Sequence, residues 1–167
     1  TKTIELHNIP GLALAVIHED EVVYESYFGK ASLEDNTLVN ENTLFRIFSA
    51  TKLITTTAIF QLVQQGDLHL EDTVSKYLTN LPEHWRKVQI KNLLSHASGL
   101  PDFIRYESSL SDQALMAKLS EDDMEFDTGS QFRYNQTNYW LLAQVIEQIT
   151  GMPFHEYVLK NQFENAR

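Results

Sequence analysis

Residues 45–66 read FRIFSATKLITTTAIFQLVQQG, and this stretch decides the fold because it predicts one long helix with a clear end. Apolar side chains recur at Ile54, Ala58 and Leu62, a spacing of four residues that places them along one helix face. Gly66 follows the last repeat and is a typical helix stop. Since the stretch carries few charged residues, the helix is expected to be buried.

A serine and a lysine stand where this helix starts. Ser49 and Lys52 form the only Ser-x-x-Lys sequence in the chain, and residues three apart share a helix face. A neutral lysine amine at that distance can accept the serine proton, and apolar neighbours such as Phe48 and Leu53 would lower the pKa of the ammonium group. The ordinary alternative is that Ser49 only caps the helix, which serine often does.

The segments on either side predict an α+β protein with a single domain over residues 1–167. An apolar run at residues 12–17, the charged turn HEDE and the β-formers that follow predict a β-hairpin before residue 30. Short helices are predicted in residues 68–82, capped by Asp72, and in residues 88–101.

Two further helices are predicted near the end of the sequence. Apolar residues at Leu141, Val145 and Ile149 share one face of a helix that Gly151 ends. Residues 153–163 predict a last helix.

Composition excludes several classes of function. The net charge of −10 repels nucleic acid, and no apolar run approaches the roughly 20 residues of a membrane span. The chain has no cysteine, and its six histidines show no metal-ligand spacing. We therefore expect no metal, no cofactor, no nucleic-acid partner and no membrane span.

Four separated segments carry a family resemblance. These are IPGLALAVIHEDEVVYESYFGKAS, FRIFSATKLITTTAIFQLVQQGDLHLEDTVSKYL, IKNLLSHASGLPDF and GSQFRYNQTNYWLLAQVIEQITG. In this order they resemble the serine β-lactamase and penicillin-binding-protein superfamily, in particular its class C and esterase-like branch. The resemblance implies a β-lactamase/transpeptidase-like fold with Ser49 as the acylated nucleophile and Lys52 as its partner base. Tyr134 would help to move the proton, and which of Lys52 and Tyr134 is the formal base stays open.

The chain departs from the family pattern at two motifs. The second family motif, Tyr-x-Asn, here reads Tyr134-Asn135-Gln136, so Gln136 is expected to supply the substrate-binding amide. Asn135 would serve only if the local backbone rotated. The third motif, Lys or His followed by a small residue and Gly, is absent. We therefore expect an N-terminal portion without the C-terminal strands of the sheet, whose hairpin pairs with that C-terminal part or with another chain.

The resemblance implies a serine hydrolase that forms an acyl-enzyme with an ester, amide or β-lactam carbonyl. Its substrate would be a small molecule or a peptide, and family habit suggests a periplasmic or secreted location. The alternative is a catalytically silent binding or scaffold module. The hydrolase interpretation predicts that the Tyr134 hydroxyl lies within hydrogen-bonding reach of Ser49 or Lys52. His96, in LLSHASGL, is expected to be a scaffold residue rather than the base of a Ser-His pair.

Overall fold

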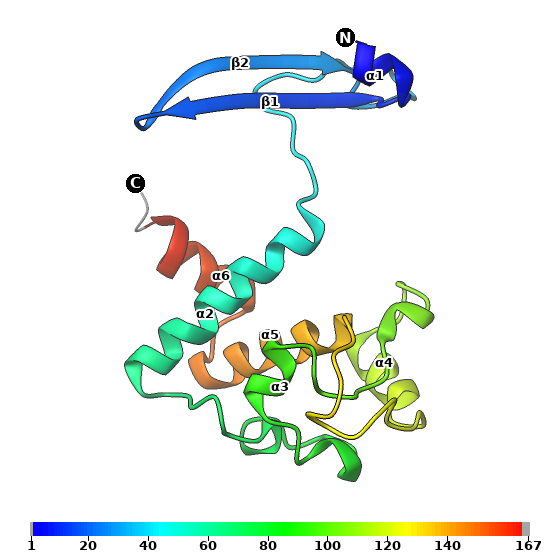
Figure 1. The fold of residues 1–167 in the computed structure, drawn as a ribbon, viewed down its shortest axis with the longest axis vertical. Helices are drawn as coiled ribbons and strands as arrows, with labels where there is room; N and C mark the ends of the chain where they lie inside the picture. The colour runs from blue at the N-terminus through cyan, green and yellow to red at the C-terminus, as the bar shows by residue number, and fades with distance from the viewer. Residues whose placement is uncertain (1, 165–167) are drawn as a thin grey trace. The chain divides into compact units, whose positions relative to one another are not determined.

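The computed structural model describes residues 2–164, which divide into two compact units (Figure 1). The first unit ends at Ile47, and the second begins at Phe48 and contains every candidate site residue. No helix among the described residues is both long enough and apolar enough to cross a membrane.

The first unit contains the expected hairpin. A short helix, α1 (Lys2–Leu6), precedes the antiparallel strands β1 (Gly11–His18) and β2 (Glu21–Gly29). The two turn residues Glu19 and Asp20 both have positive φ, 50° and 65°, which is the backbone of a primed two-residue turn. Such a turn matches the right-handed twist of the strands, so the register is set locally.

The hairpin exposes large apolar side chains. Those exposed by 45% or more in its strands are Leu14, Val16, Ile17, Val22, Val23 and Tyr24. Within residues 2–47 the sheet has only these two strands. A two-stranded sheet with apolar residues exposed is typical of strands that pack against further structure.

The helix predicted from residues 45–66 is present in the second unit. A 3-10 turn (Phe48–Ala50) leads into α2 (Thr51–Gln65), and Gly66 ends the helix with φ of 83°. Its buried side chains follow the predicted face, but Leu53 is 73% exposed. Only one face of α2 is therefore buried, although the sequence predicted a buried helix.

The second long helix, α5 (Gln136–Thr150), is the centre of the second unit (Figure 1). It packs against α2, α3 (Ile90–Leu94) and α6 (Phe154–Val158). Apolar residues from these helices and from the connections form one core, which includes Ile59, Leu62, Leu68, Trp85, Ile90, Leu93, Leu100, Leu141, Leu142 and Ile146. Beyond α6 the chain continues as a single π-helical segment, Leu159–Phe163.

The helix predicted in residues 68–82 is reduced to a 3-10 turn, Val74–Lys76. Asp72 does not cap a helix there, because its Oδ2 accepts hydrogen bonds from the His69 N–H, Lys76 Nζ and the Tyr77 hydroxyl. The side chain thus fixes a compact loop instead of a helix start.

Further elements of the second unit differ from the sequence prediction. Helix α3 ends at Leu94, well before residue 101, because His96 takes a left-handed φ of 55°. Helix α4 (Asp112–Leu119), capped by the Ser111 side chain, was not predicted. Other 3-10 turns lie at Glu83–Trp85 and Phe103–Arg105.

Candidate active site

Ser49 lies in the 3-10 turn before α2, where its side chain is exposed. The residue before it, Phe48, has a positive φ of 44°, a backbone conformation that costs energy for any side chain larger than glycine. The N-cap position of α2 is Ala50, and no side chain caps the helix. The hydroxyl of Ser49 is therefore not the helix cap and is available for another partner.

That partner is Tyr134, which lies just before α5. The Tyr134 hydroxyl donates a hydrogen bond of 2.7 Å to Ser49 Oγ, within the range expected from the sequence. The pKa of the Tyr134 hydroxyl is lowered from its ordinary value of 10.0, first by Lys52 and then by the hydrogen bond with Ser49. Lys52 favours the phenolate, and so does the Ser49 hydroxyl when it donates to the deprotonated oxygen, so this tyrosine gives up its proton more easily than a free one.

Lys52 stands on the first turn of α2 and links the two helices. Its Nζ donates a hydrogen bond of 2.7 Å to Gln136 Oε1 on α5. The same ammonium group lies over two aromatic rings, 4.7 Å from the centroid of Tyr134 and 5.4 Å from that of Tyr139. Rings at these distances attract a cation through their electron-rich faces.

The expected apolar surroundings of Lys52 are not those found. Phe48 is 76% exposed and Leu53 is 73% exposed, so neither covers the ammonium group in this chain. Phe48 lies four residues before Lys52 and Leu53 directly follows it, and both side chains point toward solvent. The partners that Lys52 does have are an amide and two phenol rings.

The two candidate substrate-binding amides have different surroundings. Asn135 is only 2% exposed and caps α5, because its Oδ1 accepts from the Asn138 N–H and its Nδ2 donates to the Leu100 carbonyl. Gln136 is half-buried and turns its side chain to Lys52. Gln136 therefore contacts Lys52, whereas Asn135 is fully engaged in holding the loop to the helix.

His96 supports the ring of Tyr134 from the buried side. The two rings lie 4.6 Å apart between centroids, and Nδ1 of His96 accepts a hydrogen bond of 3.2 Å from the Asn135 N–H. The pKa of His96 is lowered, first by burial and then by the Lys52 charge. The imidazole is thus neutral with Nδ1 as acceptor, and it is a scaffold residue that fixes the backbone next to Tyr134.

Two residues at the site were not found by sequence reasoning. Tyr139 lies under Lys52 and exchanges a hydrogen bond of 3.1 Å with Thr56 on α2. Asp102 Oδ1 accepts from the Gln136 N–H at 3.2 Å and so fixes the start of α5. Helical spacing could have predicted Tyr139, because it lies three residues after Gln136 and therefore on the same face of the helix.

The second unit therefore presents a continuous set of polar contacts. Ser49 contacts Tyr134, whose ring lies beside Lys52, and Lys52 contacts Gln136. A hydroxyl, a phenol with a lowered pKa and an ammonium group in contact can pass a proton to and from a reacting centre. Among residues 2–164 no group of three or more His, Cys, Asp or Glu side chains could hold a metal ion.

Comparisons with known proteins show the family and the fold. The family model described as Beta-lactamase matches residues 2–166. The chain is 27% identical over 160 residues to protein flp of Staphylococcus aureus strain COL, which covers 90% of this chain and 32% of flp. It thus spans about a third of the length of the curated relatives it matches.

Two solved structures have the same fold. The octameric penicillin-binding protein homologue from Pyrococcus abyssi superposes with a TM-score of 0.82 and 28% identity, covering 98% of this chain and 40% of that one. The D-amino acid amidase from Ochrobactrum anthropi SV3, complexed with L-phenylalanine, gives a TM-score of 0.83 and 25% identity, covering 98% and 46%.

Proposed function

Because this chain belongs to the Beta-lactamase family, we propose that it carries the nucleophile of a serine hydrolase that acts through an acyl-enzyme. The observation that supports this proposal best is the 2.7 Å hydrogen bond between the Tyr134 hydroxyl and Ser49 Oγ beside Lys52. Ser49 and Lys52 lie at the start of α2, Tyr134 lies just before α5, and the three side chains meet outside the apolar core.

In the proposed reaction Ser49 Oγ attacks the carbonyl carbon of an ester, amide or β-lactam. Its proton passes to the pair formed by Tyr134 and Lys52, and a C–O bond forms as the carbonyl becomes an oxyanion. The oxyanion collapses, the bond to the leaving group breaks, and the leaving oxygen or nitrogen takes the proton. Water then attacks the acyl-enzyme by the same steps and releases the acid and the free serine.

Two further groups have roles in this proposal. The backbone N–H of Ser49 donates to the oxyanion, in the way that such donors stabilise tetrahedral intermediates. The Gln136 amide has both a donor and an acceptor, so it can orient the acyl side chain of the substrate. The D-amino acid amidase with the same fold supports an amide carbonyl as the reacting group.

Covalent labelling tests the proposal. A fluorophosphonate probe or a penicillin, mixed with the full-length protein, should add one acyl or phosphonyl mass that peptide mapping places on Ser49. Ser49→Ala should abolish the adduct. Ser95→Ala, which removes a serine hydroxyl bonded to the Lys91 carbonyl, should leave labelling unchanged. An unlabelled Ser49 would refute the hydrolase proposal and favour a silent binding module.

A further inference from the structure

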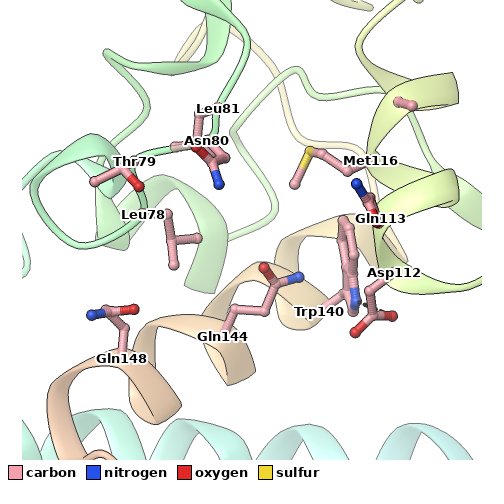
Figure 2. A pocket seen from close by; sticks show the side chains of 11 residues that line it. Leu78, Thr79, Asn80, Leu81, Asp112, Gln113, Met116, Trp140, Gln144 and Gln148 are labelled. Atoms are coloured by element: carbon pink, nitrogen blue, oxygen red, sulfur yellow. Dashed lines mark hydrogen bonds between the residues drawn. The ribbon is translucent and has the colours of Figure 1, made fainter.

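The second unit contains a cavity of about 570 Å³ that is separate from the Ser49 site (Figure 2). Its lining comes from residues 78–81, from α4 and from α5. Ser49, Lys52, Tyr134 and Gln136 do not line it. Its volume lies within the range of pockets that hold small ligands.

The polar lining of this cavity is made mostly of carboxamides. Asn80, Gln113, Gln144 and Gln148 all line it, and Asp112 is its one ionisable side chain. Carboxamides donate and accept hydrogen bonds without carrying charge, which matches hydroxyl groups, since hydroxyls also do both. With no cationic side chain in the lining, an anionic ligand would be repelled by Asp112 and by the net charge of the chain.

One of these amides lacks a partner. The Nε2 atom of Gln144 is buried and makes no hydrogen bond. The side chain projects from α5 into the space bounded by Asn80, Met116 and Trp140 (Figure 2). A buried donor without an acceptor costs free energy, and a rotation of the Gln144 side chain into the cavity would let a ligand oxygen relieve that cost.

The indole of Trp140 supplies a fixed apolar wall. Its Nε1 donates to Asp112 Oδ1 at 3.3 Å, and its ring meets Phe103 edge to face with centroids 6.3 Å apart. These two contacts hold the ring, which is only partly buried. A flat, immobilised aromatic face suits the C–H face of a pyranose ring, because both surfaces are apolar and nearly planar.

We propose that this cavity binds a neutral saccharide. The sugar ring lies on Trp140, its hydroxyls exchange hydrogen bonds with the carboxamides, and Gln144 Nε2 donates to one ligand oxygen. Leu78, Leu81 and Met116 supply apolar surface for the remaining C–H groups. The site stands apart from the proposed hydrolase and does not depend on it.

Binding is tested on the full-length protein carrying Ser49→Ala, so that no turnover interferes. Cellotriose, maltotriose and the N-acetylglucosamine trimer are titrated separately and followed by calorimetry and by tryptophan fluorescence. At least one is expected to bind with Kd at or below about 1 mM. Binding by none of the three up to about 10 mM, or binding only by a cationic glucosamine trimer, would overturn the proposal.

Two variants separate the site from a structural role. Trp140→Leu should weaken binding at least about tenfold and remove the fluorescence change. Gln144→Met should weaken binding at least about fivefold, yet keep or raise the melting temperature because it removes an unpaired buried donor. The matched control is Gln64→Met, an exposed glutamine on α2. Unchanged affinity in both cavity variants would also overturn the proposal.

Discussion

The Tyr134 hydroxyl and Ser49 Oγ are joined by a 2.7 Å hydrogen bond although 85 residues separate them in the chain. The bond connects the turn before α2 to the residue two positions before α5. It is the contact that turns a serine at a helix start into a candidate nucleophile.

Removing the Tyr134 hydroxyl should slow acylation without unfolding the protein. Tyr134→Phe keeps the ring that packs on His96 but loses the bond to Ser49, so the acylation rate should fall by about 10²- to 10⁴-fold. The rate is measured by mass spectrometry of the Ser49 adduct against time. Tyr24→Phe, in the exposed hairpin, is the control. Equal rates for Tyr134→Phe and wild type would remove Tyr134 from the mechanism.

The proximity of Lys52 should be visible in the titration of Tyr134. Because Lys52 is the main cause that lowers the pKa of Tyr134 below 10.0, Lys52→Met should move that pKa upward. The ultraviolet difference spectrum between each protein and its Tyr134→Phe counterpart follows this single tyrosine through the alkaline range.

The same shift has a kinetic consequence. If the phenolate accepts the Ser49 proton, the acylation rate rises with pH through the pKa of Tyr134, and Lys52→Met moves this rise to higher pH. The absolute rate should also fall by at least about a hundredfold. If the rise of the acylation rate occurs at the same pH in Lys52→Met as in wild type, Lys52 does not act through Tyr134.

Substitution of Asn135 should lower the stability of the protein, whereas substitution of its neighbour Gln136 should change the kinetics. Asn135→Ala removes a buried cap and leaves the Leu100 carbonyl without its donor, so unfolding free energy should fall by about 1–2 kcal/mol. Gln136→Ala removes a half-buried contact to Lys52 and should raise KM with little change in melting temperature. Denaturant unfolding and steady-state kinetics on both variants check this. A normal KM in Gln136→Ala would contradict the substrate-binding role.

His96 should make stability depend on pH. Burial lowers its pKa below the ordinary 6.5, so the unfolded chain binds more protons than the folded one between those two values. The contribution of neutral His96 to the free energy of unfolding is complete above pH 6.5. It is lost as the pH falls toward the pKa of His96 in the folded protein. The protonated ring would also face the Lys52 charge and could no longer accept from the Asn135 N–H.

The pH dependence of stability in two variants, His96→Asn and a control, checks this expectation. His96→Asn suits the left-handed backbone and keeps an acceptor, so its unfolding free energy should lose less between pH 7.5 and 5 than that of wild type. Other groups facing this ring, Asp102 and the phenols of Tyr134 and Tyr139, are present in both proteins. His69→Asn, at an exposed position, is the control. Parallel losses in wild type and His96→Asn would refute the prediction.

The sequence alone determined the features that depend on local physics. The four-residue repeat and Gly66 fixed α2, because helix periodicity and a left-handed stop act within a few residues. The apolar run and charged turn fixed the hairpin for the same reason. The Asn135 side chain caps α5, a role that the sequence analysis did not assign to it.

Tertiary structure alone decided which residues share the site and which only support it. The Tyr-x-Asn spacing already favoured Gln136, but the contact of Gln136 with Lys52 and the bond that holds Asn135 to the distant Leu100 carbonyl appear only in the tertiary structure. Likewise the unpaired Gln144 donor arises from packing between segments far apart in sequence. Periodicity reports which face of a helix is apolar, but not what it meets, because contacts between distant segments depend on the packing of the whole unit.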